Sequence, residues 1–404
     1  MEEWKEYKYT DLCSLIGGGT PKTSEPSYWG GDIPWLSVKD FGNDAKYVYT
    51  TEKTITEAGL NNSSTKLLKR DDIIISARGT IGAIAMLASE MAFNQSCFGI
   101  RSNDLVGQHY LYYLTKTKIN ELQKNSHGSV FDTITRDTFA KIDCAIPSIA
   151  TQTKISRLLS SLDDKIEVNR KINENLEQQA QALFKSWFVD FEPFKNGEFV
   201  ESELGMIPKG WRVEVLGDVC KCILGGTPSR NKEEYWNGNI AWINSGEVNE
   251  FRIVKPSEYI TEEGLKHSAT KLLPKKTTVL AITGATLGQV SLLEIDSCAN
   301  QSVIGVLEND NIPYEFIYPL INVKITELCS HMTGGAQQHI NKNNVEQLNI
   351  VLPSENVMAE YKEKTKSIYS QITNCCFESR HLAELRDTLL PKLMSGELKV
   401  NDNV

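Results

Sequence analysis

Residues 18–35 read GGTPKTSEPSYWGGDIPW, and residues 225–242 read GGTPSRNKEEYWNGNIAW. The two stretches share a Gly-Gly-Thr-Pro phrase, a Tyr-Trp pair and an Ile-x-Trp ending, and the second lies 207 positions after the first. Solenoid repeats have periods of only about 20–50 residues. A repeat at this distance therefore predicts a whole domain that is present twice.

The correspondence continues along both halves of the chain. The further phrases that recur at a similar offset are TEAGL at 56–60 with TEEGL at 261–265, TKLL at 65–68 and 270–273, NQS at 94–96 and 300–302, and PS at 147–148 and 353–354. A chain of 404 residues also exceeds the size of an ordinary single core. Both observations predict two copies of one domain.

Each copy is followed by a long segment with hydrophobic residues at alternating steps of four and three, which is the heptad pattern of a coiled coil. The expected seam positions are Ile155, Leu159, Leu162, Ile166, Asn169, Asn173, Leu176 and Leu183 in the first segment, and Ile368, Ile372, Leu382 and Leu389 in the second. Each stripe needs a partner, and the chain has only these two long helices. We therefore expect them to pair with each other as an intramolecular antiparallel coiled coil, with pseudo-twofold symmetry between the halves.

A zipper between two chains is the alternative for these helices. Asn169 and Asn173 on the seam favour a spacer, because buried polar residues cost stability but fix register. A helix of about 35 residues is roughly 50 Å long. Pro193 is expected to end the first helix and Pro391 to break or bend the end of the second, with residues 190–208 as a linker.

The repeated domains combine strand-like and helical segments. Residues 72–76 and 278–282 predict strands, and residues 109–122 predict a helix. The expected fold class is therefore α/β (α+β), duplicated, with two globular domains joined by two long helices. The predicted parts are a first domain at 1–150, a central helix at 151–192, a linker and second domain at 193–354, and a C-terminal helix at 355–398.

Composition narrows the class of protein. The chain shows no apolar run long enough to cross a membrane and no signal-peptide pattern, so we expect a soluble, cytoplasmic protein. Nine scattered cysteines without paired C-x-x-C modules indicate reduced thiols and no zinc site. The net charge of −9 argues against a strong DNA binder, since phosphate contacts use Lys and Arg. Any basic surface must be local, or a partner must supply it.

Catalytic motifs are absent from the sequence. It contains no Walker A phrase, no Gly-x-Gly-x-x-Gly fingerprint, no Pro-Pro dipeptide of the kind that amino-methyltransferases place beside a target base, and no H-E-x-x-H. No catalytic, cofactor-binding or metal-binding residue is assigned. A self-contained nuclease or methyltransferase stays open as an alternative, and activity of the purified chain alone would favour it.

The doubled phrase and doubled helix together resemble the specificity subunit of a type I restriction-modification system. The resemblance covers essentially the whole chain, although the Pro-Pro and Glu-Gln phrase that often begins each helix in that family is replaced by Pro147-Ser148 with Gln152 and by Pro353-Ser354 with Glu355. It implies two target recognition domains that each read half of a split DNA site, with the helices as the ruler between them. It also implies a non-catalytic subunit that docks two adenine methyltransferase subunits and restriction subunits. S-adenosylmethionine and ATP with Mg would bind in those partners, with no cofactor in this chain.

Two copies that read different half-sites should differ where they touch base edges, so polar residues in divergent loops are the candidate DNA contacts. Arg and Lys suit guanine and phosphate, and Asn and Gln suit adenine. The first copy offers Lys22, Thr23, Ser24, Ser37, Lys39, Arg78, Thr80, Ser129 and Arg136. The second offers Ser229, Arg230, Asn231, Lys232, Asn244, Ser245, Thr283, Thr286, Gln337, Gln338 and Lys342.

Residues that are identical in both copies cannot distinguish two half-sites. The Gly-Gly-Thr-Pro turns could cradle phosphates through backbone N–H groups, but we interpret them as structural turns in which Gly supplies unusual backbone angles. The Trp pairs 29/35 and 236/242 are interpreted as core residues rather than base-stacking platforms. A coiled-coil scaffold with duplicated protein-binding domains is the remaining alternative, and it suits the acidic charge.

Overall fold

The structure, a computed structural model, describes residues 4–42, 45–126, 133–330 and 339–400. The chain divides into two compact units. Unit 1 comprises residues 1–168 and 381–404, and unit 2 comprises residues 169–380. Each unit contains one copy of the repeated domain and a part of each long helix, so both helices run from one unit into the other. The predicted limits at residues 150, 192 and 354 remain predictions.

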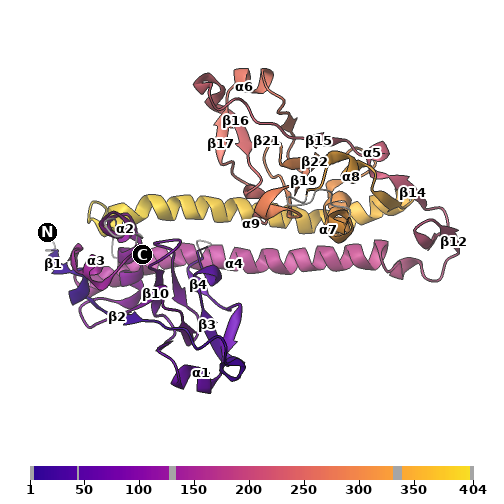
Figure 1. Cartoon of the computed structure of the whole chain (residues 1–404). Coiled ribbons are helices and arrows are strands. Elements are labelled where there is room, and N and C mark those ends of the chain that lie inside the picture. Colours follow the sequence, from indigo (N-terminus) through magenta and orange to yellow (C-terminus); the bar gives the residue numbers. More distant parts are fainter. Residues whose placement is uncertain (1–3, 43–44, 127–132, 331–338, 401–404) are drawn as a thin grey trace. The chain divides into compact units, whose positions relative to one another are not determined.

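In the described residues of unit 1, the strands form three sheets, and three α-helices precede α4 (Ile149–Phe188) in the sequence (Figure 1). Its strands are β1 (Lys5–Lys8), β2 (Cys13–Gly17), β3 (Trp29–Leu36), β4 (Tyr47–Val48), β5 (Lys53–Ile55), β6 (Leu67–Leu68), β7 (Ile73–Ser76), β8 (Ile84–Leu87), β9 (Met91–Phe93), β10 (Cys97–Ser102) and β11 (Asp143–Ile146). Its short helices are α1 (Glu57–Asn61), α2 (Gln108–Ser126) and α3 (Arg136–Ala140). The predicted strand at 72–76 and helix at 109–122 are thus confirmed.

The sheets of unit 1 are mostly antiparallel. The strand orders are β2-β10-β7-β8-β4, β5-β3-β9-β6 and β1-β11. Strand β7 is buried along its whole length, as its Ile-Ile-Ile-Ser sequence predicts for a central strand with both faces covered. The main core lies between this sheet and α2, where Tyr110, Leu111 and Leu114 are buried.

Unit 2 repeats this arrangement. Its strands are β12 (Phe199–Ser202), β13 (Gly205–Pro208), β14 (Arg212–Val215), β15 (Cys222–Leu224), β16 (Trp236–Ile243), β17 (Glu258–Ile260), β18 (Leu272–Leu273), β19 (Thr278–Ala281), β20 (Val290–Leu292), β21 (Ser297–Ala299), β22 (Val303–Val306) and β23 (Asn349–Leu352). Its short helices are α5 (Leu216–Val219), α6 (Glu262–Lys266), α7 (Tyr314–Ser330) and α8 (Lys342–Glu346). The orders β15-β22-β19-β20, β17-β16-β21-β18 and β14-β23 match those of unit 1 except at one edge, where a single parallel bridge between Ile253 and Leu293 stands in place of strand β4. The common order confirms the duplication.

The two long helices are α4 (Ile149–Phe188) and α9 (Glu355–Met394), each of 40 residues. In unit 2 they run antiparallel, because Asn169 donates to Glu378 whereas Phe184, further along α4, packs edge-on against Tyr361, which lies earlier in α9. In unit 1, Ile155 and Leu159 of α4 share a core with the end of α9. The predicted antiparallel pairing within one chain is therefore confirmed.

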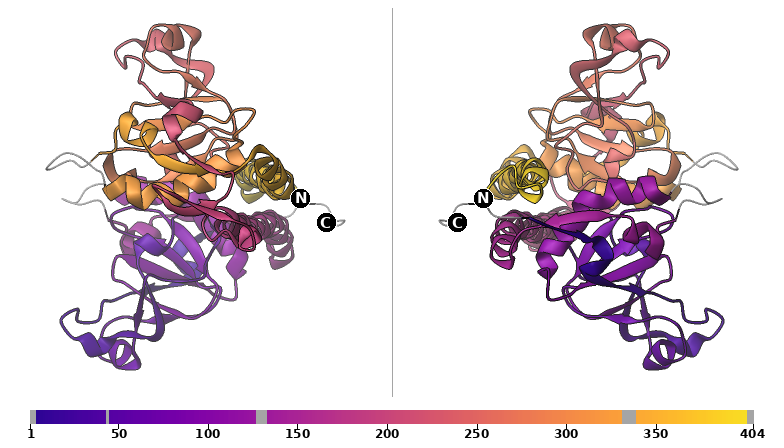
Figure 2. Two further views of the ribbon diagram at one scale, coloured as in Figure 1. Left: turned by 90° about the vertical axis from the view of Figure 1, so that its right-hand side faces the viewer. Right: turned by 90° about the vertical axis from the view of Figure 1, so that its left-hand side faces the viewer.

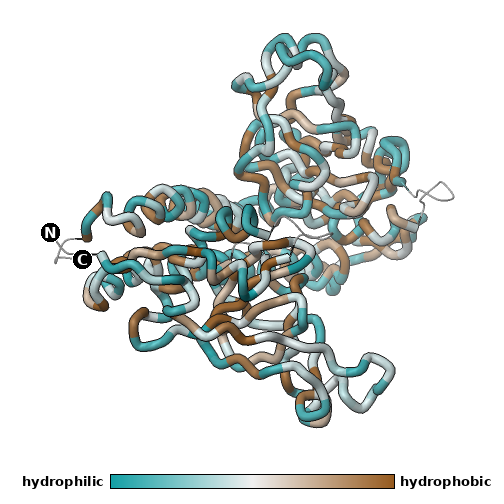
Figure 3. Tube along the Cα trace, turned by 60° about the vertical axis from the view of Figure 1, so that its left-hand side comes forward, coloured by the Kyte–Doolittle hydropathy of each residue, from teal (hydrophilic) through white to brown (hydrophobic). Residues whose placement is uncertain are grey.

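Figure 3 shows hydrophilic and hydrophobic residues interspersed along the helical segments of the chain. In each unit the sheets and short helices lie to one side of α4 and α9 (Figure 2). Each long helix is therefore covered both by its partner helix and by a globular domain. This double covering predicts a wider buried stripe than a two-stranded coiled coil has.

The burial of the seam positions reflects the double covering. The buried seam residues are Ile155, Leu159, Asn169, Asn173 and Ile372, and the half-buried ones are Leu162, Ile166, Leu176, Leu183, Ile368, Leu382 and Leu389. Asp163 follows the half-buried Leu162, and Glu177 follows the half-buried Leu176. Both acidic side chains are buried, and they accept hydrogen bonds from Tyr113 and Arg252 of the globular domains. Asn169 and Asn173 donate to Glu378 and to the Cys376 sulfur across the helix pair.

The expectation that Pro193 ends the first helix was wrong, and Pro391 does not break the second helix. Helix α4 ends at Phe188, before Pro193, and Phe191 adopts a left-handed conformation with φ of 53°. Helix α9 continues through Pro391 to Met394. The predicted linker is also structured, because β12 and β13 form a hairpin there.

Candidate nucleic-acid interface

The repeated Gly-Gly-Thr-Pro phrase packs against the repeated Asn-Gln-Ser loop in both units. A Cβ atom on Gly18 would lie 2.1 Å from the backbone oxygen of Asn94, and one on Gly225 would lie 2.1 Å from that of Asn300. Trp35 Nε1 donates to the Gly19 oxygen over 3.1 Å, which holds the turn on β3. The same bond joins Trp242 and Gly226 in unit 2 at 3.1 Å.

The structural interpretation of these turns is confirmed, but its stated cause was wrong. None of the glycines in the two phrases has a positive φ. At each of these glycines, backbone atoms of a neighbouring loop lie where a Cβ atom would be. Glycine is therefore required by this close approach of two backbone segments, and not by an unusual backbone angle. Trp35 and Trp242 are buried, as expected of core residues, whereas Trp29 and Trp236 are half-buried and pack edge-on against them.

Backbone hydrogen bonds bring three loops of unit 1 together. Ala77 N donates to Ser96 O over 2.8 Å, and Ile134 N donates to Ala77 O over 3.0 Å. The loop after β7, the Asn-Gln-Ser loop and the start of α3 therefore converge. Two predicted DNA contacts, Arg78 and Arg136, lie next to these bonds, and both side chains are exposed.

Unit 2 makes the same junction. Ile282 N donates to Ser302 O over 2.9 Å, and Ile340 N donates to Ile282 O over 3.1 Å. Thr283 and Lys342 follow these positions in the chain, so the predicted contacts that differ between copies occupy equivalent places. Lys342 pairs with Glu346 one turn later, with Nζ and Oε1 2.9 Å apart. Thr286 lies in the loop between β19 and β20, and Gln289 N donates to its backbone oxygen over 2.9 Å.

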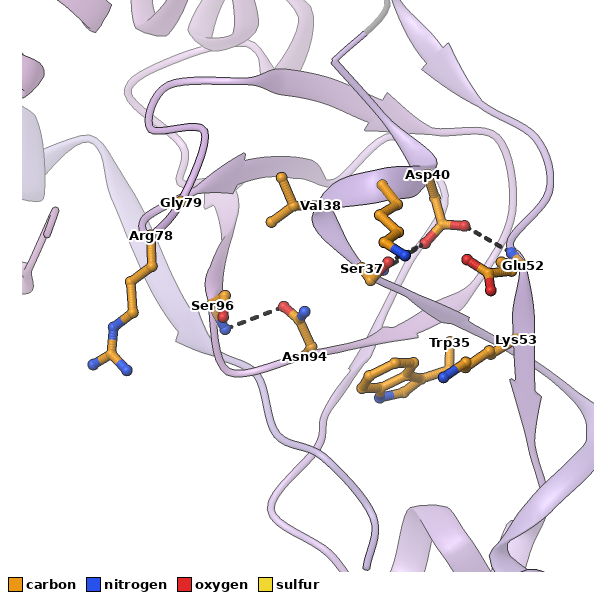
Figure 4. Close-up of a pocket in the computed structure, with 11 residues that line it drawn as sticks. Trp35, Ser37, Val38, Asp40, Glu52, Lys53, Arg78, Gly79, Asn94 and Ser96 are labelled. Carbon is orange, nitrogen blue, oxygen red and sulfur yellow. Dashed lines mark hydrogen bonds between the residues drawn. The ribbon is translucent and has the colours of Figure 1, made fainter. Parts of the chain in front are cut away.

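A cleft of about 440 Å³ in unit 1 collects three of the predicted residues, Ser37, Lys39 and Arg78 (Figure 4). Trp35, Lys53, Asn94 and Ser96 also line it. Figure 4 shows the Arg78 side chain extending away from the other lining residues. Arg78 has no hydrogen bond or ion pair with any residue in the described ranges, and Thr80 follows it in the same exposed loop.

A second cleft, of about 310 Å³, is lined by Arg78, Gln95, Thr133, Arg136 and Asp137 among others. Arg78 thus borders both clefts. Lys39, Arg78 and Arg136 place three exposed cations along this surface, in a chain whose net charge is −9. Together with Lys53, the lining of the two clefts carries four cations against the carboxylates of Asp40, Glu52 and Asp137. This surface is therefore less acidic than the chain as a whole, and it holds cations of the kind that contact phosphate.

Two predicted contacts are held by hydrogen bonds inside their own loops. Ser37 Oγ donates to Asp40 over 2.8 Å, and the Ser37 backbone N–H donates to the same carboxylate over 2.7 Å. Asn244 accepts from Gly246 N over 2.7 Å and donates to Ser257. Ser245 lies beside it and is half-buried. These bonds fix the shapes of the loops after β3 and after β16.

Arg230 is bound within unit 2. Its guanidinium donates to both oxygens of Glu258 over 2.7 and 2.6 Å and lies 3.6 Å from the centroid of the Trp236 ring. Hydrogen bonding to Arg230 lowers the pKa of Glu258. Lys53 is the residue of unit 1 that corresponds to Glu258. In the antiparallel strand pairs, Lys53 lies opposite Trp35, and Glu258 lies opposite Trp242. The Lys53 ammonium lies 5.8 Å from the Trp29 ring.

The other predicted residues lie apart from the clefts or outside the described ranges. Lys22, Thr23 and Ser24 form an exposed turn whose Lys22 oxygen accepts from Trp29 Nε1, and they line neither cleft. Ser229, Asn231 and Lys232 form the equivalent exposed turn in unit 2, where Lys232 donates to Tyr235 Oη. Ser129, Gln337 and Gln338 lie outside the described residues.

Lys53 and Gln95 line the clefts but were missed in the sequence. Lys53 could have been found by the divergence argument, since a glutamate occupies its place in the second copy. Gln95 could not have been found by that argument, because the second copy has the same residue, Gln301, at the corresponding position.

Within the described ranges, no group of three His, Cys, Asp or Glu side chains could hold a metal ion. In that same part of the chain, no helix has both the length and the hydropathy needed to cross a membrane. The described cysteines are free thiols, and burial raises the pKa of Cys13 and Cys97 to about 12. Such thiols stay protonated and unreactive near neutral pH.

The chain is similar to several known proteins. Over 411 residues it is 33% identical to the type I restriction enzyme MjaIX specificity subunit of Methanocaldococcus jannaschii, in an alignment that covers 99% of this chain and 95% of that protein. Over 470 residues it is 25% identical to the type I restriction enzyme HindI specificity subunit of Haemophilus influenzae, covering 98% and 100%. The crystal structure of the S subunit of a type I restriction-modification system from M. genitalium shares the fold, with a TM-score of 0.57 at 14% identity over 97% of this chain and 96% of that one.

Residues 1–178 and 208–381 match the family of the type I restriction modification DNA specificity domain, so the match covers both copies of the repeat. Specificity subunits are the non-catalytic DNA-recognition components of their systems. The doubled domain, the paired helices and these matches agree. The chain therefore belongs to the type I restriction-modification DNA specificity family, as a specificity subunit with two recognition domains.

Proposed function

We propose that each repeated domain reads one half of a bipartite, gapped site in double-stranded DNA, and that α4 and α9 set the length of the gap. The observation that carries this proposal is the junction of three loops in each unit. Its framework is the same in both copies, but the polar side chains on it differ, as the exposed Arg78 differs from the half-buried Thr283. A common frame with different polar residues suits two readers of different sequences.

The charges of unit 1 support a protein that binds DNA weakly by itself. Three exposed cations, Lys39, Arg78 and Arg136, line the clefts beside the carboxylates of Asp40, Glu52 and Asp137, and the whole chain carries a net charge of −9. The counterion-release contribution to affinity scales with the number of phosphates that cations neutralise. Three such contacts give modest affinity, so a partner supplies the remainder.

The partners follow from the family. We propose that the subunit docks two adenine methyltransferase subunits and, in the complete complex, restriction subunits. S-adenosylmethionine and ATP with Mg bind in those partners, and the chain itself holds no cofactor. Each long helix has 40 residues and is about 60 Å long, which is enough to separate two half-sites by several base pairs.

The test is a map of adenine methylation by long-read sequencing, in cells with and without this gene and with its genomic neighbours intact. Loss of a two-part motif with a fixed gap is the expected result. Exchange of residues 1–150 for those of a relative should then alter one part of the motif only. An unchanged methylome in the deletion strain would contradict the proposal, and partner capture would then test the scaffold function.

A further inference from the structure

The Asn-Gln-Ser loop presents one exposed glutamine in each unit. Asn94 Oδ1 accepts from Ser96 N over 3.1 Å, and Asn300 Oδ1 accepts from Ser302 N over 3.0 Å. This side-chain turn closes the loop without help from the residue between. Gln95 and Gln301 are therefore not needed to hold the loop, and both are exposed.

A threonine orients each glutamine. Thr20 Oγ1 donates to Gln95 Oε1, and Thr227 Oγ1 donates to Gln301 Oε1. These threonines come from the Gly-Gly-Thr-Pro turn, which the close approach of Gly18 to Asn94 holds in place. The threonine hydroxyl takes one of the two acceptor positions of the amide oxygen, and both Nε2–H donors are left for a ligand.

The surroundings of Gln95 belong to the proposed DNA surface. Gln95 lines the 310 Å³ cleft together with Arg78 and Arg136. Its neighbours differ between the copies, since Arg78 corresponds to Thr283, whereas the glutamine and its threonine are the same in both. A group that is constant among variable neighbours suits a ligand that is constant in both half-sites. The sugar-phosphate backbone is such a ligand.

An amide donor also suits an acidic protein. Gln can donate to a phosphate oxygen without carrying a positive charge, and a hydrogen bond to a charged group is worth more than a neutral one. Reading adenine through a bidentate contact requires the amide oxygen as acceptor for the adenine amino group. Here the threonine hydroxyl takes one of the two acceptor positions of that oxygen. Because the glutamine is also the same in both copies, a phosphate, which both half-sites share, is the better match.

We propose that Gln95 and Gln301 each donate a hydrogen bond to a phosphate of the DNA backbone in their half-site, and that Thr20 and Thr227 are the positioning residues for these contacts. This inference rests on the proposed function. It adds a sequence-independent contact that both recognition domains share.

The test uses the full-length chain in complex with its methyltransferase subunits, and a duplex that contains the methylated motif found by sequencing. Gln95→Ala should raise Kd about 10-fold, the effect of losing one hydrogen bond to a charged group. The slope of log K against log salt should stay the same, because a neutral donor releases no counterion. Arg78→Ala is the matched comparison and should reduce the magnitude of that slope by about 1, because a cation at the DNA surface displaces counterions.

Three further variants complete the design. Gln301→Ala should weaken DNA binding in the same way through the other domain. It also replaces Gln95→Ala as the test if that variant does not fold. Thr20→Val should weaken binding as Gln95→Ala does, whereas Thr20→Ser, which keeps the hydroxyl, should restore it. The methylated motif should be unchanged in both halves for all of these glutamine and threonine variants.

Two outcomes would overturn the inference. A change of the first half of the motif in Gln95→Ala would make the glutamine a base reader, and unchanged affinity and motif would make the pair structural. A failure of the unmodified complex to bind or methylate DNA would instead contradict the proposed function itself, and the inference would fall with it. The unmodified complex thus distinguishes the two failures.

Discussion

Asp163 of α4 and Arg386 of α9 form a buried ion pair in unit 1, with Oδ1 and Nη1 2.7 Å apart and both side chains at most 4% exposed. The other Asp163 oxygen accepts from Tyr113 Oη of α2 over 2.5 Å. One carboxylate therefore joins both long helices to the globular domain.

Removal of one member of this pair should destabilise unit 1. Arg386→Met leaves the Asp163 charge buried without its cation, which costs about 3–5 kcal/mol. Urea unfolding of the purified chain measures the change. The double variant Asp163→Leu with Arg386→Met should recover much of the loss, because an apolar pair replaces the charges. A double variant as unstable as the single one would contradict this account.

The Gly-Gly-Thr-Pro turn should not tolerate a methyl group at its first glycine. In Gly18→Ala the Cβ atom meets backbone at 2.1 Å, and we expect a loss of about 3 kcal/mol of unfolding free energy. Gly17→Ala is the matched control, since no atom lies within 4 Å of the place that its Cβ would take. Equal unfolding midpoints for the two variants would show that the close approach does not matter.

Glu315 of α7 should make unit 2 less stable as pH rises. The residue is 2% exposed, and burial raises the pKa of its carboxyl. The unfolded chain loses this proton at a lower pH than the folded chain, so stability falls as pH rises from the unfolded pKa through the folded pKa. Glu315→Gln should therefore stabilise the protein at pH 7 and have little effect below about pH 4. Glu360→Gln, at an exposed position of α9, is the control. An equal gain in the free energy of unfolding from both variants would contradict the role of burial.

Arg78 should affect one half of the DNA motif. In Arg78→Thr the first copy receives the residue that the second copy has as Thr283. A base contact by arginine is worth about 1–3 kcal/mol of discrimination. Methylation sequencing of a strain with this variant should show a relaxed first half and an unchanged second half. An unchanged motif with weaker methylation at every site would point to a phosphate contact instead.

Arg230 should contribute little to DNA recognition. Glu258 neutralises its charge, and Trp236 covers one face of the guanidinium. Arg230→Ala should leave the methylated motif unchanged. It should also lower the free energy of unfolding by no more than about 1 kcal/mol, the usual value for an exposed pair. A changed second half of the motif would restore Arg230 as a base reader.

The sequence predicted the architecture well because its signals were long. The repeat and the antiparallel helices rest on patterns that extend over many residues. The ends of the helices were less predictable, since Pro193 and Pro391 are local signals. Packing decided those ends, as α9 shares a core with α4 through Leu390 and Leu393, and it continues past its proline to keep that contact.

The candidate site was only partly predictable. Divergence between the copies led to Arg78 and Arg136, which the structure brings to one cleft. It also selected Arg230, whose partner Glu258 lies 28 residues away in the sequence. The ion pair between Arg230 and Glu258 depends on the register of β16 and β17. The prediction used only the type of each side chain and its position in a loop, and neither reveals that register.

The composition of the two units has a consequence for synthesis. Unit 2 is a continuous segment, residues 169–380, whereas the core of unit 1 includes Leu390, Leu393 and Met394. Domains generally fold as units while the chain emerges from the ribosome, in order from the N-terminus. Here the domain that is made first must wait for the helix that is made last, so the second domain can complete its core earlier than the first.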